Sequence, residues 1–352
     1  MLNELPAPPS GKTGWPWTEE TPPPPEAMPD GSCWPRISIV TPSYNQRPFI
    51  EETIRSVLLQ GYPNLEYMVI DGGSPDGSLE IIRQYAPWLA YWVSEPDRGQ
   101  SDAINKGWQR ATGELLAWLN SDDVYEPQAL LRVAAARAAH PRAGLIHGLC
   151  LEFDETGIRR LSGGPYDMLT AITVSSAKGG GVAQPAAFVT RQAVSRVGML
   201  DCRLKQSMDR DLWQRTAALY EVAFLPQVLA RFRVHWQQLS QQHTRDKNFL
   251  FSRERHITIE NLFALKGLPP QVFRARRRAL AKTHLQLALE LRFAGAASLA
   301  FRHLLLALAS HVIAVRDRSD LRVLGLALVG PRVASLLSTV KRRCIAARER
   351  VK

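Results

Sequence analysis

Short apolar runs alternate with stretches of helical periodicity over residues 36–133 of the chain. The apolar runs are ISIVTP, YMVIDGG, AYWVSE and LLAWLN, and the stretches between them are FIEETIRSVLLQ, SLEIIRQYA and DAINKGWQRA. A continuous apolar run indicates a strand that is buried on both faces, as in a parallel sheet covered by helices. The alternation therefore predicts an α/β fold with a mostly parallel sheet, and LIHGLCLEF within 144–154 adds a further strand.

Polar side chains follow these predicted strands directly. Asp71 ends the second run, and Asp122 and Asp123 follow the fourth. Residues 43–45 and 96–99 follow the first and third runs in the same way. In open parallel sheets, ligands bind in the crevice beyond the carboxyl ends of the strands. We therefore expect these strand ends to deliver their polar groups to one binding site.

The adjacent carboxylates of Asp122 and Asp123 form a candidate metal site. Two neighbouring charged carboxylates repel each other unless a cation lies between or beside them. Mg²⁺ takes one or two carboxylates and completes its shell with water and phosphate oxygens, and Mn²⁺ suits the same ligands. Such an ion points to a nucleotide-diphosphate substrate. The competing interpretation is that both acids only cap a helix that starts near Pro127.

Composition sets the broad class of protein. At 352 residues, the chain can hold one large domain and a smaller helical region. Its four cysteines show no Cys-x-x-Cys spacing, which argues against a zinc site or a disulfide framework and fits a reducing cytoplasm. Prolines crowd residues 6–35, so this lead is expected to be extended or disordered, with Trp15 and Trp17 docking on the folded body. Secretion is not expected, because no signal-peptide pattern is found.

Positive charge is concentrated towards the C-terminus. Residues 270–352 hold 17 Lys and Arg against 4 Asp and Glu, whereas the whole chain has a net charge of +11. The basic residues alternate with Leu, Ala and Val rather than with aromatic residues, which argues against a nucleic-acid partner. Helical periodicity predicts two facing helices here, with Leu285 and Ala288 on the first and Leu304 and Leu308 on the second.

Residues 332–352 form an amphipathic segment, with Val333, Leu337 and Val340 on one face and basic residues elsewhere. Such a helix can lie on an anionic membrane surface. The alternative is a helix packed on its own domain with a solvated basic face. The uncharged stretch 303–315 is shorter than the roughly 20 residues that cross a bilayer, so no transmembrane helix is expected.

Seven segments, in order along the chain, resemble the motifs of family 2 glycosyltransferases with the GT-A fold. They lie within residues 36–242 and read ISIVTPSYNQ, MVIDGGSPDGS, EPDRGQSDAINKG, ATGELLAWLNSDDVYEP, QPAAFVTRQAVSRVGMLD, MDRDLW and RFRVH. The resemblance implies a GT-A type, Rossmann-like sheet flanked by helices, with a C-terminal helical extension. We accordingly divide the chain into a proline-rich lead at 1–35, a glycosyltransferase catalytic domain at 36–245 and a basic helical region at 246–352.

The resemblance also implies roles for the polar residues at the strand ends. Asp71 would accept a hydrogen bond from the nucleotide base, Arg98 would approach the pyrophosphate, and Asp122 would lie at the ribose and the metal. The competing interpretations are an ordinary turn residue for Asn45 and a surface arginine for Arg98. The implied nucleotide-binding residues are Pro42, Tyr44, Asn45, Asp71, Arg98 and Asp122, and the implied ligands of Mg²⁺ or Mn²⁺ are Asp122, Asp123 and His235.

The catalytic base of the family is the second acid of an acidic pair, which here reads Met208-Asp209. Asp209 is therefore expected to deprotonate the acceptor hydroxyl as it attacks the anomeric carbon, with inversion of configuration. Asp211 is the competing candidate, and both acids also suit the N-terminus of a helix. His235 matches the histidine that the family places near the metal or diphosphate, and a hydrogen-bonded structural histidine is the alternative.

Together these residues predict a metal-dependent, inverting glycosyltransferase. It would move one sugar from a nucleotide-diphosphate sugar to a hydroxyl of a glycan or lipid-linked acceptor, in cell-surface polysaccharide or related glycan synthesis. An anionic membrane surface would be a further partner of this cytoplasmic enzyme, at the inner membrane face. The alternative, motivated by Met208, is a catalytically silent glycan- or nucleotide-sugar-binding scaffold of the same fold. A dehydrogenase is set aside because TPSYNQ lacks the glycine-rich turn of dinucleotide-binding folds.

Overall fold

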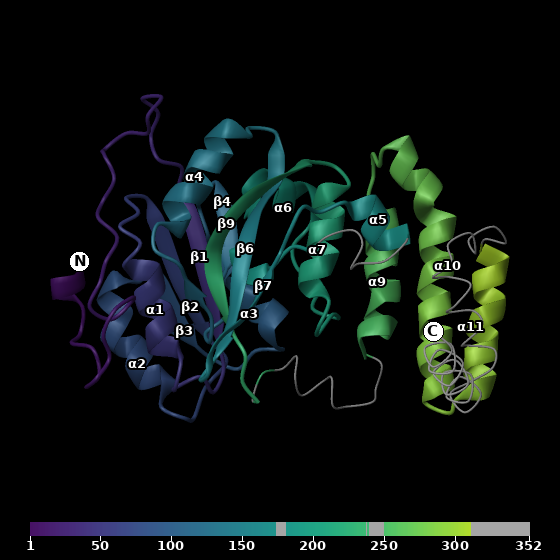
Figure 1. Cartoon of the computed structure of the whole chain (residues 1–352), viewed down its shortest axis with the longest axis horizontal. Coiled ribbons are helices and arrows are strands. Elements are labelled where there is room, and N and C mark those ends of the chain that lie inside the picture. Colours follow the sequence, from purple (N-terminus) through teal and green to yellow (C-terminus); the bar gives the residue numbers. More distant parts are fainter. Residues whose placement is uncertain (174–180, 237, 239–249, 311–352) are drawn as a thin grey trace, which may run out of the picture.

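The computed structural model describes residues 1–173, 181–236, 238 and 250–310. A twisted sheet with helices on both faces occupies one side of Figure 1, and the helices α9, α10 and α11 follow one another on the other side. The helices are α1 (Ile50–Leu58), α2 (Ser78–Tyr85), α3 (Gln100–Arg110), α4 (Ala129–Ala139), α5 (Met168–Thr173), α6 (Arg191–Val197), α7 (Met208–Ala217), α9 (Leu250–Ala264), α10 (Pro270–Phe293) and α11 (Ala297–Ser310).

Within the described residues, nine strands form one sheet in the order β3-β2-β1-β4-β8-β6-β9-β5, with β7 paired to β6. The first four strands of this order are parallel, and so are β6 and β9, whereas β5, β7 and β8 pair antiparallel. The predicted α/β fold with a mostly parallel sheet is therefore confirmed. The strands are β1 (Ile37–Ser43), β2 (Leu65–Asp71), β3 (Tyr91–Ser94), β4 (Leu115–Trp118), β5 (Val124–Tyr125), β6 (Ala143–Asp154), β7 (Gly157–Ser162), β8 (Ala187–Thr190) and β9 (Glu221–Arg233).

The central strands are apolar on both faces because helices cover both. In β1, Ile37 and Ile39 join the hydrophobic core under α1, α2 and α4, whereas Val40 joins the core under α3, α6 and α7. Gly107 of α3 lies so close to β1 that a Cβ there would be 2.5 Å from Val40 Cγ2. This close approach fixes α3, whose N-terminus opens onto the candidate site.

The proline-rich lead is packed on the folded body. Arg55 of α1 is fully buried and donates hydrogen bonds to the carbonyl oxygens of Pro6 (2.9 Å), Pro16 (3.0 Å) and Trp17 (2.8 Å). The Trp15 indole donates to a carbonyl oxygen of β5 at 2.7 Å. The expected docking of this segment is confirmed, because a buried guanidinium satisfies carbonyl oxygens that have no sheet partner.

The C-terminal helices pack in sequence. Leu285 and Ala288 of α10 form a small core with Leu304 and Ala307 of α11, which confirms the predicted helix pair. Leu308 is 40 % exposed, so Ala307 takes the place that the periodicity gave to Leu308. Among the described helices, none combines the length and the apolarity that a membrane crossing requires. The amphipathic segment 332–352 lies outside the described residues.

Candidate active site

Asp71 organises the loop that follows β2. Its carboxylate is fully buried and accepts hydrogen bonds from the backbone N–H groups of Gly73 (3.1 Å) and Ser74 (2.9 Å). The hydroxyls of Ser74 (2.5 Å) and Ser94 (2.6 Å) also donate to it. Ser74 Oγ in turn accepts the N–H of Asn45 at 2.9 Å. One acid thus joins the loops that follow β1 and β2 to the end of β3, and its contact with a nucleotide base stays a prediction.

Tyr44 lies at the rim of this loop cluster and is 59 % exposed. The Tyr44 ring and the Asp97 carboxylate both approach Gly72. A Cβ at residue 72 would lie 3.2 Å from Tyr44 Cδ2 and 2.8 Å from Asp97 Oδ2, so only a glycine leaves room for both. Pro42 is buried in β1, opposite Ile70 of β2. The exposed aromatic ring is therefore the member of the predicted nucleotide set that can stack on a base, and Pro42 supports the strand beneath it.

Arg98 lies on the loop between β3 and α3, with 79 % of its side chain exposed. Its Nη2 forms an ion pair with Asp102 Oδ1 at 2.6 Å, and its backbone N–H donates to Asp102 Oδ2 at 3.1 Å. The hydrogen bond from Arg98 lowers the pKa of the Asp102 carboxyl. To bind a pyrophosphate, the guanidinium would exchange this carboxylate for phosphate oxygens, so its contact with the pyrophosphate stays a prediction.

The two acids of the Asp122-Asp123 pair face different surroundings. Asp122 Oδ2 lies 2.9 Å from His235 Nε2, and both side chains are largely buried. Asp123 is fully buried and accepts hydrogen bonds from the backbone N–H of Arg233 (3.1 Å) and the Asn120 amide (3.3 Å). Burial, and then the neighbouring Asp122, raise the pKa of Asp123 well above its ordinary value. Asp123 therefore serves the local structure, whereas Asp122 and His235 converge.

The end of β9 holds this acid–histidine contact in place. Arg233 Nε donates to the Asp122 carbonyl oxygen at 3.0 Å, and its Nη2 lies 3.0 Å from Glu52 of α1. The guanidinium also lies over the ring of Phe49, with its Cζ 5.0 Å from the ring centroid. The same ring packs on His235, with centroids 4.6 Å apart. Residues of α1, of β9 and of the loop that carries Asp122 and Asp123 thus fix the imidazole of His235.

The described residues contain no cluster of three or more His, Cys, Asp and Glu side chains arranged to hold a metal ion. Asp122 and His235 fit such an ion as a pair, because a carboxylate oxygen and an imidazole nitrogen converge and His235 Nδ1 is buried without a hydrogen-bond partner in the described structure. Mg²⁺ and Mn²⁺ need few protein ligands when a diphosphate and water supply the rest. The metal role predicted for Asp123 stays a prediction that its hydrogen bonds do not favour.

Three amides link the loops of the site and were missed by the sequence analysis. Gln100 Nε2 donates to Asn120 Oδ1 at 2.5 Å, and Asn120 Nδ2 donates to Gln184 Oε1 at 3.0 Å. Gln184 Nε2 donates to the carbonyl oxygen of Trp118 at 2.9 Å. Each amide lies inside a motif that was recognised, but a neutral side chain gave no separate signal.

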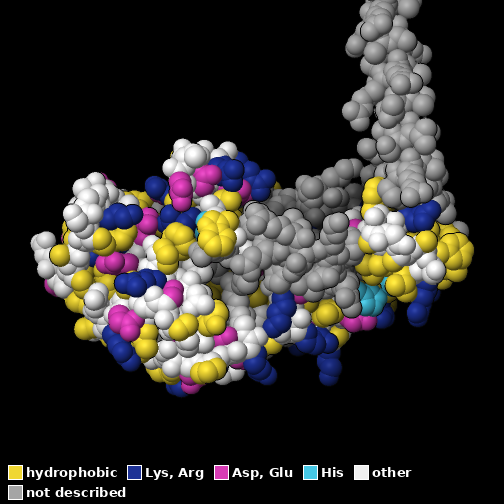
Figure 2. All heavy atoms as spheres, turned by 90° about the horizontal axis from the view of Figure 1, so that it is seen from below, with side chains coloured by type: hydrophobic (Ala, Val, Ile, Leu, Met, Phe, Trp, Pro, Cys, Tyr) yellow, Lys and Arg dark blue, Asp and Glu magenta, His cyan; other side chains and the backbone are white. Residues whose placement is uncertain are grey.

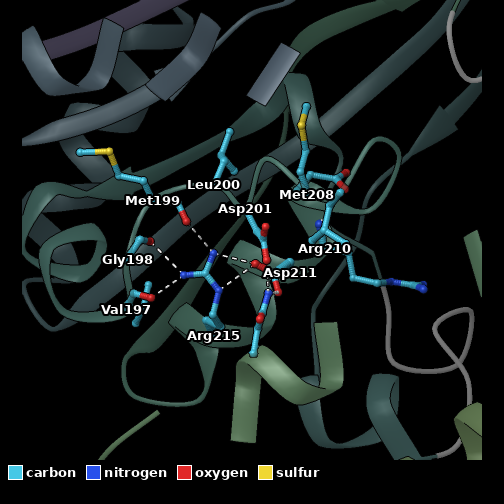
Figure 3. Close-up of polar contacts among 12 residues, drawn as sticks. Val197, Gly198, Met199, Leu200, Asp201, Met208, Arg210, Asp211 and Arg215 are labelled. Atoms are coloured by element: carbon cyan, nitrogen blue, oxygen red, sulfur yellow. Dashed lines mark hydrogen bonds and ion pairs between the residues drawn. The ribbon is translucent and has the colours of Figure 1, made fainter. Parts of the chain in front are cut away.

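Asp211, the competing candidate for the base, is a structural residue. Its side chain is fully buried in an ion pair with Arg215 at 2.7 Å, and it accepts a hydrogen bond from Asn261 of α9 at 3.0 Å. Figure 3 shows the Arg215 guanidinium reaching from Asp211 to the carbonyl oxygens that end α6, and it donates to Gly198 at 2.9 Å and to Met199 at 2.8 Å. A carboxylate held in this way is less suited to accept a substrate proton than one without an ion pair.

Asp209 lies in the first turn of α7 and, unlike Asp211, forms no ion pair among the described residues. Burial raises the pKa of its carboxyl, which increases its affinity for a proton. The preceding Met208 contacts Ser101 of α3, with Sδ and Oγ 2.7 Å apart. Because Ser101 comes three residues after Arg98, the start of α7 lies beside the loop that is predicted to meet the donor.

Comparison with known proteins points to one family. Residues 38–197 match the family model "Glycosyl transferase family 2". An uncharacterized glycosyltransferase of Mycobacterium tuberculosis is 29 % identical over 201 residues, which cover 56 % of this chain and 75 % of that protein. A Bacillus subtilis protein named putative teichuronic acid biosynthesis glycosyltransferase TuaG is 38 % identical over 99 residues, 27 % of this chain and 39 % of its own.

Solved structures share the fold. Mannosyltransferase PcManGT from Pyrobaculum calidifontis, in complex with GDP-Man and Mn²⁺, superposes with a TM-score of 0.53 at 23 % identity, over 96 % of this chain and 90 % of its own. Residues 1–349 of TarS from S. aureus superpose with a TM-score of 0.58 at 17 % identity, over 84 % of this chain and 87 % of that one. At these identities the likeness shows the fold alone.

The buried ion pair predicts a large loss of stability when it is broken. Replacing Arg215 by Met leaves Asp211 buried without its cation, which should lower the free energy of unfolding by about 3 to 5 kcal/mol. Arg203, 65 % exposed in its pair with Asp201, is the matched control, and Arg203→Met should cost no more than about 1 kcal/mol. Urea unfolding measures both, and equal losses for the two variants would contradict the structural role of the Asp211–Arg215 pair.

Proposed function

The chain belongs to glycosyltransferase family 2, and from this premise we propose that it transfers one sugar from a nucleotide-diphosphate sugar to a hydroxyl acceptor, with inversion and with the help of Mg²⁺ or Mn²⁺. The observation that carries the proposal is the contact between Asp122 and His235, which lie 113 residues apart in the sequence and 2.9 Å apart in space. The mannosyltransferase of the same fold, whose solved structure is in complex with GDP-Man and Mn²⁺, supports the pairing of a nucleotide sugar with a divalent ion.

The donor nucleotide binds at the loops after β1 and β2. Tyr44 offers its exposed ring for stacking on the base, and Asn45 and Asp71 supply polar groups beside it. Among the described residues, Asp71 Oδ1 accepts a single hydrogen bond, which leaves it one lone pair. Because the carboxylate is fully buried, the loop after β2 would have to open for that lone pair to meet an N–H of a uracil- or guanine-type ring. Arg98 takes the pyrophosphate from the side of α3 when it releases Asp102.

The diphosphate lies at Asp122 and His235. These two side chains would hold the divalent ion, which when bound neutralises the negative charge of the leaving diphosphate. Asp123 keeps the geometry of the pair by binding the backbone N–H of Arg233. Gln100, Asn120 and Gln184 orient the loops around it through their amide hydrogen bonds.

Asp209 acts as the general base. It takes the proton from the acceptor hydroxyl, whose oxygen bonds to the anomeric carbon while the bond from that carbon to the diphosphate oxygen breaks. Attack on the face opposite the leaving group inverts the configuration. The buried ion pair of Asp211 with Arg215 favours Asp209 over Asp211 for this role.

A catalytically silent scaffold is the second candidate, because Met208 stands where the family has the first acid of the pair. The structure gives this methionine a packing role, since it is buried and contacts Ser101. The acid that would act as base is still present at the next position. Turnover of a nucleotide sugar distinguishes the two candidates, and the retained Asp209 favours the enzyme.

The acceptor is a glycan or a lipid-linked acceptor, and the protein works peripherally at the inner membrane face. The similarity to the putative teichuronic acid enzyme supports a role in cell-surface polysaccharide synthesis. On α11, Phe301, Leu305 and Leu308 are each at least 40 % exposed and share one helix face. Basic side chains lie beside hydrophobic ones at this end of the molecule (Figure 2). An apolar stripe flanked by positive charge suits an anionic bilayer.

The base assignment predicts a variant that binds but does not turn over. Asp209→Asn should bind the donor as tightly as the parent and transfer sugar about 10² to 10⁴-fold more slowly, because the amide keeps the shape and loses the proton acceptor. Nucleoside diphosphate release and calorimetric titration measure the two quantities. Parent-like turnover in Asp209→Asn would place the base elsewhere in the fold.

The membrane role predicts that three exposed side chains matter for lipid binding. The full-length variant Phe301→Ser/Leu305→Ser/Leu308→Ser should lose co-sedimentation with phosphatidylglycerol vesicles, and parent binding should weaken as salt rises. Ile158→Ser/Leu161→Ser is the control, since these exposed side chains belong to β7. If the parent ignores anionic vesicles at low salt, the peripheral location is wrong.

A further inference from the structure

Glu254 of α9 binds the segment that leads into α7. Its side chain is buried, at 2 % exposure, and its carboxylate accepts three consecutive backbone N–H groups, those of Lys205 (2.6 Å), Gln206 (3.0 Å) and Ser207 (2.9 Å). Ser207 is the N-cap of α7, and its own side chain makes no capping hydrogen bond. Glu254 therefore supplies, from another helix, the negative group that a helix N-terminus favours.

The same segment also touches the donor side of the site. Lys205 Nζ donates to the carbonyl oxygen of Arg98 at 2.9 Å, and Met208 Sδ lies 2.7 Å from Ser101 Oγ. Residues 205–208 thus lie between α9 and the loop that precedes α3. Asp209 is the next residue, so a shift of this segment would move the base relative to the donor.

We propose that Glu254 is a positioning residue for Asp209: by binding the three N–H groups before α7, it sets the place of the base against the donor loop. The inference rests on the proposed function, because it takes Asp209 as the base. It adds a residue of the C-terminal helical region to the catalytic arrangement. In Figure 1, α9 lies between α7 and α10, which is where such a support must be.

The charge of Glu254 adds a second effect on the same base. Burial is the main cause that raises the pKa of Asp209, and the negative charge of Glu254 raises it further. The backbone N–H and the guanidinium of Arg210 lower it, and among the described residues Tyr166 is a further titratable group that interacts with Asp209. Removing the Glu254 charge should therefore make Asp209 a weaker base.

A purely structural role is the competing explanation, because α9 is already joined to α7 elsewhere. Asn261, two turns further along α9, donates to Asp211. That contact anchors α7 at its second acid, while Glu254 acts before the helix begins. The two explanations differ in what they predict for kcat and for its pH dependence, since loss of general stability does not move the pKa of one carboxyl.

The test compares Glu254→Gln with Glu260→Gln, a control on the same helix whose side chain is 59 % exposed and paired with His256. Full-length variants are assayed for nucleoside diphosphate release with Mn²⁺ and either GDP-mannose or UDP-glucose as donor. Glu254→Gln should lose about 10²-fold in kcat, as a misplaced catalytic group does, with the donor KM within a few-fold of the parent. Because the base must be deprotonated to act, kcat falls at low pH, and this acid limb of the pH profile should lie at lower pH in Glu254→Gln than in the parent.

Two further measurements separate the effects. Glu254→Asp keeps the charge with a shorter reach, so it should keep the acid limb while recovering only part of kcat. Hydrogen exchange of the backbone amides reports the contact in the absence of a nucleotide sugar. The N–H groups of residues 205–207 should exchange faster in Glu254→Gln than in the parent, and at the parent rate in Glu260→Gln.

The outcomes distinguish the inference from the function on which it rests. If Asp209→Asn is slow but Glu254→Gln matches Glu260→Gln in kcat, the positioning role is wrong and the base assignment stands. An unmoved acid limb together with a general loss of stability would also overturn it. If parent and Asp209→Asn release nucleoside diphosphate at the same rate, the base assignment itself fails, and with it the positioning of that base.

Discussion

The hydrogen bond between the Asp123 carboxylate and the backbone N–H of Arg233 is the contact on which the rest of the site depends. It joins two parts of the chain that lie 110 residues apart, and it is made by a side chain with no exposure to solvent. A buried carboxylate is costly unless it is hydrogen-bonded, so this acid fixes the end of β9 beside the acidic loop. The neighbouring Asp122 then meets His235. One acid of the pair thus provides structure, and the other is the acid that we propose binds the metal ion.

The sequence was sufficient for the parts of the site that follow from strand periodicity. Asp71 and Asp122 stand directly after buried strands, and the carboxyl ends of parallel strands gather at one edge, so their common location could be predicted. The different surroundings of Asp122 and Asp123 could not, because they depend on the antiparallel pairing of β5 with β9. Gln100, Asn120 and Gln184 were missed because neutral amides show no function until the loops that carry them are brought together.

The C-terminal region illustrates the same limit. Its composition suggested a basic helical extension, and the contact between α10 and α11 follows from apolar spacing along each helix. The attachment of α9 to the site depends instead on two polar side chains, Glu254 and Asn261, which bind α7 and the segment before it. Polar contacts between elements distant in sequence leave no periodic pattern. The boundary near residue 245 therefore stays a prediction, and the contacts make α9 part of the structure that holds α7 and the segment before it.

The most direct test of the account is a calorimetric titration of GDP and UDP, with and without Mn²⁺, into the parent, Asp122→Asn and the exposed-site control Glu221→Gln. We expect Mn²⁺ to strengthen nucleotide binding to the parent and to the control, and Asp122→Asn to lose this dependence while its thermal unfolding is unchanged. If the parent binds nucleotide equally well with and without Mn²⁺, or if Asp122→Asn shows the full Mn²⁺ effect, Asp122 and His235 do not bind the metal ion of the donor site.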